Sequence, residues 1–265
     1  MGVNNYFCVN KLDCDMNKLT ALVVGLALTV LPAAAQSHAA IDFDSWDDFN
    51  RIEISNNDRH VETSLNFALP MYFGWSTLTE TSPDLGGPWA LMNGIYPGNE
   101  FDRVGLNFVY EIEMVNLHVR YKRLNLSAGL RWTFMDFAFG DATRTFSKSN
   151  GVYWPVPISD PAYDFKKSKL HASYLGVPVR LGVNFGLATL YAGASIEMRT
   201  EGYAKYRNPR TRTSMKDAFN PVRATVEAGF SYANFGVFVQ YGLTPFFAPE
   251  YSPAKTLTFG LTLGI

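Results

Sequence analysis

The feature that most constrains this chain is a strict alternation of apolar residues with polar or small ones. It recurs in eight segments, which begin near residues 62, 103, 124, 175, 189, 222, 236 and 256. Successive side chains of a β-strand point to opposite faces of a sheet, so a period of two predicts strands rather than helices. No long amphipathic helical pattern competes with this interpretation. The sequence therefore predicts an all-β fold with eight strands.

The connections between these segments alternate in length. Tight turns are predicted near residues 122–124, 185–187 and 233–234, whereas long polar loops cover 76–102, 140–168, 199–219 and 244–254. Short turns at one end and long loops at the other are typical of bacterial transmembrane β-barrels. Within the second segment the alternation slips by one residue near Val115–Asn116, which indicates a β-bulge.

Side-chain size indicates which face of the barrel lies outside. A soluble barrel places its apolar face inside around a ligand, whereas a membrane barrel presents that face to lipid. The interior of an eight-stranded barrel is narrow, so small residues belong inside it. Here the polar face carries most of the glycines of the strands: Gly105, Gly129, Gly176, Gly182, Gly193, Gly229, Gly236, Gly260 and Gly264. We therefore predict an eight-stranded antiparallel up-and-down transmembrane β-barrel over residues 62–265, with its polar face inside.

The chain ends in the alternating segment KTLTFGLTLGI, at residues 255–265. An unpaired strand edge is costly in lipid, because no water is present to satisfy its backbone groups. The last strand is therefore expected to pair with the first, around Leu65 to Trp75, and to close the barrel. Aromatic residues near the predicted strand ends are expected to form interfacial belts: Phe73, Trp75, Tyr121, Phe134, Phe137, Tyr232, Phe235, Phe246 and Phe247.

The N-terminal region carries the pattern of a cleavable signal peptide. Lys18 precedes an apolar run over residues 19–31, and Ala33, Ala34 and Ala35 form a small-residue cleavage site. We expect residues 1–35 to be an upstream extension and signal peptide, and 36–61 to be a periplasmic segment whose acidic residues are solvated. Both cysteines precede the cleavage site, so the mature chain has no disulfide. The predicted location is the outer membrane of a Gram-negative bacterium, with the long loops outside the cell.

Eight charged residues lie on the polar faces of the predicted strands. They are Arg103, Glu111, Glu113, Arg131, Arg180, Glu197, Arg223 and Glu227. Charges are tolerated inside a protein when they are paired and hydrogen-bonded, so a mutually neutralising network that plugs the lumen is expected. The alternative is a narrow gated channel, in which exchange of ion-pair partners opens a path for water.

The sequence contains no strong catalytic signature. His171 and Ser173 share one face of a strand near the long-loop end, but no established nucleophile, zinc or phosphate-binding motif accompanies them. We predict a non-enzymatic protein without cofactor or metal, and a lipid A-modifying enzyme remains the alternative. The basic residues Lys205, Arg207, Arg210 and Arg212 are candidates for binding lipopolysaccharide phosphates. A net charge of −1 in an exported protein argues against a nucleic-acid partner.

Three segments resemble one known family. LHASYLGVPVRLGVNFG is similar to a characteristic strand of the Bacteroidetes outer-membrane β-barrel (PorT-like) family, and FGVFVQYGLTPFF and KTLTFGLTLGI resemble its last two strands. The chain ends in Ile265 where outer-membrane barrels commonly carry an aromatic residue. The resemblance implies an outer-membrane barrel that meets the barrel insertion machinery during assembly, with a link to protein secretion. Beyond assembly, the expected role is envelope integrity or surface interaction, with outer-membrane lipids and lipopolysaccharide as partners.

The signal peptide gives a direct prediction. Cleavage after Ala35 leaves Gln36 as the first residue of the protein in the outer-membrane fraction. N-terminal sequencing of that fraction checks the result. A mature protein that still carries Cys8 and Cys14 would contradict it.

Overall fold

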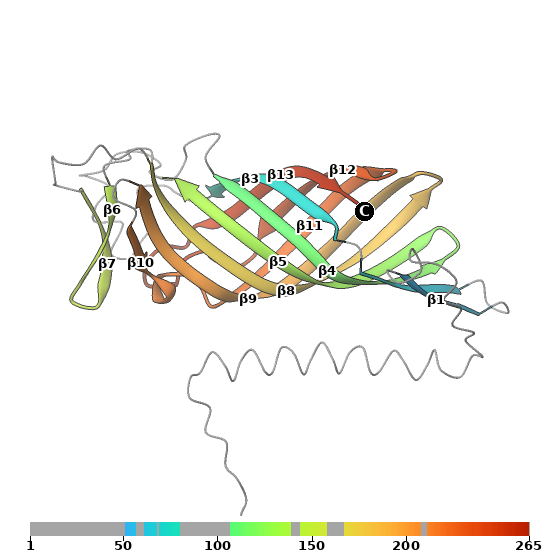
Figure 1. The fold of residues 1–265 in the computed structure, drawn as a ribbon, viewed down its shortest axis with the longest axis horizontal. Helices are drawn as coiled ribbons and strands as arrows, with labels where there is room; N and C mark the ends of the chain where they lie inside the picture. The colour runs from blue at the N-terminus through green and yellow to red at the C-terminus, as the bar shows by residue number, and fades with distance from the viewer. Residues whose placement is uncertain are drawn as a thin grey trace, which may run out of the picture.

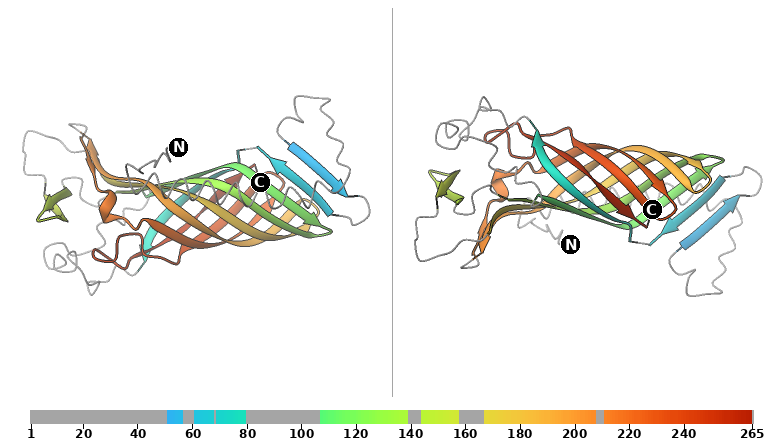
Figure 2. Two further views of the ribbon diagram at one scale, coloured as in Figure 1. Left: turned by 90° about the horizontal axis from the view of Figure 1, so that it is seen from below. Right: turned by 90° about the horizontal axis from the view of Figure 1, so that it is seen from above.

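Eight strands form one closed antiparallel barrel in the computed structural model (Figures 1 and 2). The structure describes residues 51–56, 61–67, 69–79, 107–138, 144–157, 167–207 and 211–264. The barrel strands are β3 (Met71–Thr79), β4 (Phe108–Tyr121), β5 (Leu124–Ala138), β8 (Lys167–Phe185), β9 (Ala188–Arg207), β11 (Val222–Tyr232), β12 (Phe235–Gly242) and β13 (Lys255–Leu263). Their order around the barrel is β4-β3-β13-β12-β11-β9-β8-β5, and β5 pairs again with β4. The predicted eight-stranded antiparallel barrel is confirmed.

The barrel closes between the last strand and the first. β13 pairs with β3 over nine residues, from Lys255 opposite Thr79 to Leu263 opposite Met71. Inside the barrel, the Thr258 hydroxyl donates a hydrogen bond to Ser76 Oγ at 3.0 Å. The predicted pairing of the final segment with the first strand is confirmed for Met71 to Trp75, and it leaves neither strand with a free edge along this seam. Leu65, which was assigned to the same strand, lies instead in a separate strand over Val61–Asn66 that pairs with β4 and not with the final segment.

The two faces of the strands differ as the alternation predicts. Outward-facing Trp75, Ile196 and Phe259 expose 42%, 62% and 54% of their surface. Inward-facing Arg131, Thr133 and Thr258 expose none. A barrel with an apolar outer surface and a polar lumen is the reverse of a water-soluble barrel. Its outer surface is suited to contact with lipid rather than with water.

Glycines on the inner face make room for large side chains. A Cβ atom on Gly229 would lie 2.4 Å from the Tyr191 ring, and one on Gly176 would lie 2.4 Å from Glu197 Cγ. Real Cβ atoms do not approach other atoms so closely, so Gly229 could be replaced only if Tyr191 moved. At Gly176 the backbone oxygen of Ile196 also lies 2.4 Å from the Cβ position, so a movement of side chains would not make room there. The small residues of the polar face thus allow its long Arg, Glu and Tyr side chains to fill the lumen.

Two register shifts set which residues point inward. One lies in β4 between Glu113 and Val115, where the sequence predicts a slip. The other lies between β8 and β9, where Ser173 pairs with Glu201 while Tyr174 pairs with Arg199. Thr200 is the extra residue of this second bulge, and it changes the inward positions of β9 from odd numbers, as at Glu197, to even numbers, as at Ala204.

Strands also extend beyond the barrel at both ends. At the short-turn end, β1 (Arg51–Asn56) and β2 (Val61–Asn66) form a hairpin, and β2 pairs with β4 (Figure 1). At the long-loop end lie the hairpin of β6 (Arg144–Ser149) with β7 (Val152–Pro157), the short strand β10 (Thr211–Ser214) and the 3₁₀ helix η3 (Lys216–Ala218). Among the described residues, no helix is long and apolar enough to cross a membrane.

The sequence interpretation was wrong about parts of three loops. In the expected loop at 76–102, residues 76–79 belong to β3. Residues 199–219 were expected to form a loop, but β9 continues to Arg207 and pairs with β10. Similarly, β6 and β7 occupy part of the expected loop at 140–168. Beyond Met198 the outward positions of β9 carry Tyr203 and Lys205 instead of aliphatic residues, so the apolar alternation stops before the strand does. The signal peptide lies outside the described residues.

Deletion of residues 256–265 tests the closure seam. Without β13, the edges of β3 and β12 lose their partners, and we expect the chain to fail to assemble in the outer membrane rather than to form a shortened barrel. Heat-modifiable migration on a gel and protease resistance of the membrane fraction measure assembly. Recovery of a folded, protease-resistant barrel from the deletion variant would contradict this expectation.

Candidate functional site

The centre of the lumen holds a connected network of buried charges. Arg131, from β5, lies at its middle with its side chain fully buried. Its Nη1 atom is 2.6 Å from Glu227 Oε2 and 3.1 Å from Glu111 Oε2. Its Nη2 atom is 3.0 Å from Glu197 Oε1 and donates to Ser195 Oγ at 2.9 Å. One guanidinium therefore joins carboxylates from β4, β9 and β11.

Two further arginines extend this network across the lumen. Arg180 donates to Glu227 through Nε and to Glu113 through Nη2. Arg223 Nη1 donates to Glu197 at 2.8 Å, and its Nη2 donates to Gln240 Oε1 at 2.6 Å. Each of Glu227 and Glu197 thus bridges two arginines. Planar guanidinium groups suit such forked contacts, and the result is a chain of alternating charges that crosses the lumen.

The charges of the described network do not balance. It contains three arginines and four glutamates, and Glu111 has the weakest hydrogen bonding of the four. Neither oxygen of Glu111 has a hydrogen bond of good geometry, and its one ion pair within the described residues is that with Arg131. Glu111 is therefore the member whose removal should disturb the network least.

Above the charges, towards the long-loop end, the lumen is filled by an outer apolar layer. It combines strand residues with residues from the loops before β11 and β13, among them Met135, Phe137, Leu170, Tyr174, Met215, Phe219, Phe246 and Phe247. The Phe246 ring lies 4.8 Å from that of Phe137 and 4.9 Å from that of Phe247. Backbone hydrogen bonds from Ala248 to Ala218 and from Phe246 to Ala254 hold the loops over the opening.

This layer corrects one interpretation of the sequence. Phe137, Phe246 and Phe247 were assigned to the lipid-facing belts, but each exposes no more than 1% of its surface and lies inside the barrel. Phe137 occupies an inward position of β5, and the other two lie in a loop that folds back into the lumen. Phe73, Trp75, Tyr121, Tyr232 and Phe235 do lie on the outer surface.

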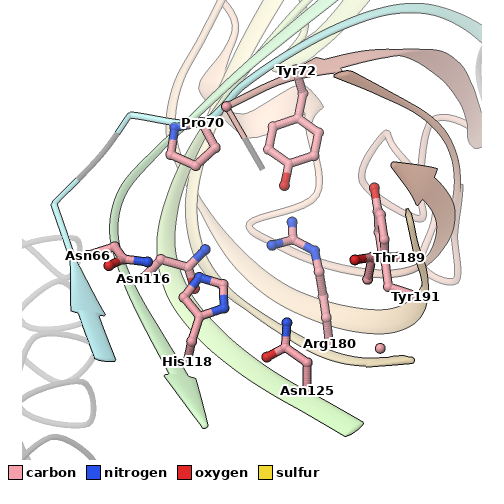
Figure 3. A pocket seen from close by; sticks show the side chains of 11 residues that line it. Asn66, Pro70, Tyr72, Asn116, His118, Asn125, Arg180, Thr189 and Tyr191 are labelled. Atoms are coloured by element: carbon pink, nitrogen blue, oxygen red, sulfur yellow. The ribbon is translucent and has the colours of Figure 1, made fainter. Parts of the chain in front are cut away.

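Below the charges, towards the short turns, the lumen opens into a vestibule of about 150 Å³ (Figure 3), and most of the residues that line it have a polar group in the side chain. Tyr72, His118, Asn125 and Tyr191 line it, and Arg180 forms its inner end. The Arg180 guanidinium carbon lies 5.2 Å from the centre of the Tyr72 ring and 5.8 Å from that of Tyr191. The lumen therefore has three layers, and the charged network separates the vestibule from the outer apolar layer.

The structure brings together seven of the eight charged residues assigned to the lumen from the sequence. Arg103 is the eighth, and it lies outside the described residues. Parity along the strands was enough to find the seven. Sequence reasoning missed Ser195, Gln240 and Asn116, which add one hydrogen bond each to Arg131, Arg223 and Glu113 respectively. Their polar types at inward strand positions were the available signal.

Of the basic residues assigned to lipopolysaccharide, Lys205 and Arg212 are cross-strand partners at the long-loop end. Lys205 lies on the outer surface, with its Nζ atom 3.3 Å from Asp136. Arg212 pairs with Glu201 at 3.0 Å, and its guanidinium carbon lies 3.6 Å from the centre of the Tyr203 ring. For Arg207 the structure gives only its strand position opposite Lys167, and Arg210 lies outside the described residues.

His171 and Ser173 do not form a catalytic pair in this arrangement. The Ser173 hydroxyl is hydrogen-bonded to Thr200 Oγ1 at 2.7 Å. His171 Nδ1 is 2.6 Å from Asp136 Oδ1, and its ring stacks on Tyr203 with 4.5 Å between ring centres. Asp136 thus orients the imidazole on the outer surface of the barrel, and sequence reasoning missed this residue because it comes from a different strand. No group of three His, Cys, Asp or Glu residues suited to a metal ion occurs among the described residues.

Comparisons with known proteins give a likeness of fold. No family model and no curated protein match the chain. Among solved structures, it is similar to Neisserial surface protein A (NspA), with 11% identity over 74% of this chain and 96% of that one, at a TM-score of 0.36. It is also similar to LpxR from Salmonella typhimurium, with 10% identity over 81% of this chain and 87% of that one, at a TM-score of 0.23. We draw nothing about activity or ligands from likenesses of this size, and membership of the PorT-like family remains a prediction.

Substitution of Arg131 by Met tests the network. It leaves buried glutamates without their shared partner, and we expect the free energy of unfolding to fall by about 3–5 kcal/mol. Urea titration of the barrel folded in lipid vesicles measures the change. The matched control is Arg131→Met combined with Glu111→Gln, which restores the net charge of the described network and should recover part of the loss. Equal stability of Arg131→Met and the wild type would contradict the assigned role of Arg131.

Proposed function

We propose that this protein is a non-enzymatic outer-membrane β-barrel whose lumen is plugged, so that it contributes to the envelope through its surfaces and not by conducting solutes. The observation that carries the proposal is the chain of ion pairs across the lumen, whose arginine and glutamate side chains are at most 8% exposed. The outer apolar layer fills the lumen above this network. On the short-turn side of the network lies the vestibule.

The length of the lipid-facing band supports a membrane location. In β5 the outward residues are all apolar over 124–134, in β8 over 175–185 and in β9 over 188–198, which is 11 residues in each strand. A tilted strand needs about 9–11 residues to cross the hydrocarbon of a bilayer. In this orientation the short turns and the β1–β2 hairpin face the periplasm, and the long loops with β6, β7 and β10 face outwards.

Envelope integrity or surface interaction is the role that fits a plugged barrel. The resemblance to the PorT-like family adds a link to protein secretion as part of the proposal. A deletion strain profiled for protein secretion and for envelope permeability to dyes separates these roles, since a purely structural role would change permeability without a specific loss of secreted proteins.

Recordings in planar bilayers test the plug directly. We expect the purified wild-type barrel to give no stable conductance steps, because the charged network and the apolar layer occupy the lumen. A larger open porin added to the same bilayer is the positive control for insertion and recording. Stable, large conductance steps from the wild-type barrel would contradict the proposal and favour the gated channel.

A lipid-modifying enzyme is the second candidate, and one observation favours it. Asp136 accepts from His171 Nδ1 on the outer surface, an arrangement that would leave Nε2 able to act as a base. Mass spectrometry of lipid A from cells that carry wild type, His171→Ala or no protein tests this candidate. A lipid A species that requires His171 would support an enzyme, and identical profiles would support the non-enzymatic role.

A further inference from the structure

A patch of charged residues lies on the outer surface of the barrel, above the lipid-facing band. Lys169, Lys205 and Arg212 occupy one row across three adjacent strands, since Lys205 is the cross-strand partner of both Lys169 and Arg212. We call these three residues the basic row. The row below it contains Asp136, His171 and Tyr203, which are also cross-strand partners.

Strand parity places both rows outside the lumen. Their chain neighbours Phe137, Leu170 and Ala204 are at most 1% exposed and belong to the outer apolar layer inside the barrel. Because successive side chains of a strand point to opposite faces, the residues directly before and after these neighbours point away from the lumen. In the membrane orientation proposed above, they lie at the level of lipid head groups.

Asp136 gathers the cationic groups of the patch. The Nζ atoms of Lys169 and Lys205 each lie 3.3 Å from its carboxylate, and His171 Nδ1 lies 2.6 Å from it. Asp136 is one carboxylate against these two ammonium groups, and Glu201 pairs with Arg212 at 3.0 Å. The three cations of the basic row therefore face two carboxylates, and the patch keeps a net positive charge. Each ammonium has three N–H donors, and the contacts with Asp136 leave donors for another anion.

Below the polar pair Ser173 and Glu201, which follow His171 and Tyr203 towards the short turns, the surface is apolar and aromatic. Phe134 and Trp132 stack with 5.1 Å between ring centres, and the Phe134 ring lies 6.4 Å from that of His171. Leu175 and Ile196 continue the same band on β8 and β9. A ligand that fits both surfaces needs an anionic head group joined to acyl chains that run down the band.

We propose that the basic row binds the phosphate of a phosphorylated glycolipid of the outer leaflet, with the acyl chains of this lipid against Trp132 and Phe134. Ammonium and guanidinium groups held side by side suit a phosphate, which accepts several charge-assisted hydrogen bonds. This inference rests on the membrane location in the proposed function, and it names the lipid group, the residues and the face of the barrel. Asp136 acts as a positioning residue that holds Lys169 and Lys205 close together.

Lipid retention by the full mature chain in phosphatidylcholine nanodiscs tests the inference. The probes are bisphosphorylated lipid A and the same lipid A after enzymatic removal of its phosphates, and native mass spectrometry counts the molecules retained. We expect the wild type to prefer the phosphorylated probe, and Lys169→Gln with Lys205→Gln to lower its affinity about tenfold. The matched control, Lys122→Gln with Arg123→Gln, removes the same charge at the short-turn end and should bind as the wild type does.

Two further variants complete the retention experiment. Lys169→Arg with Lys205→Arg should restore binding, and Arg212→Gln, at an exposed side chain, provides a variant that folds if the double variant does not. Equal retention of both probes, or displacement of lipid A by an excess of inorganic phosphate, would overturn the inference. Heat-modifiable migration of the same samples shows whether the barrel has inserted, and it separates the two proposals. A barrel that inserts without a preference for phosphate contradicts only the lipid site. Failure to insert contradicts the membrane location.

Discussion

The rest of this structure depends on the pairing of charges inside a closed barrel. Removal of an arginine or a glutamate from water costs several kcal/mol, which is recovered only if its partners are close and well oriented. Arg131 meets this condition by contacts with three strands, and Glu197 and Glu227 pass the interaction on to Arg223 and Arg180. The network therefore joins opposite walls of the barrel and fixes how the strands face one another, while the outer surface is free to be apolar.

The same constraint separates the functions of the two faces. The lumen is filled by its own ion pairs and by the outer apolar layer. The outer surface and the two ends of the barrel are therefore the parts that can contact other molecules. The outer surface changes character after 11 residues in β5, β8 and β9, where apolar side chains give way to Asp136, Ser173 and Glu201. Since β8 and β9 contain 19 and 20 residues, they carry these polar rows beyond the apolar band.

Much of this arrangement could be predicted from the sequence because a barrel strand has only two faces. Alternation was sufficient to assign the inward side of Arg131 and Glu227, the bulge after Glu113 and the pairing of the last strand with the first. It could not assign Phe246 and Phe247, since a loop has no period and their inward direction comes from backbone hydrogen bonds to distant segments. Likewise, the contact between Asp136 and His171 joins two strands whose relative register a single sequence does not reveal.

The most direct test of a lipid-facing outer surface and a plugged lumen uses the absence of cysteine from residues 36–265. A single cysteine at Val179, on the outer face, or at Thr133, fully buried in the lumen, gives two matched variants of the folded barrel in vesicles. A probe at position 179 should be quenched by lipids brominated on their acyl chains, and a water-soluble maleimide should fail to label position 133 from either side. Rapid labelling at position 133, or a probe at position 179 that reports water and no quenching, would contradict this account.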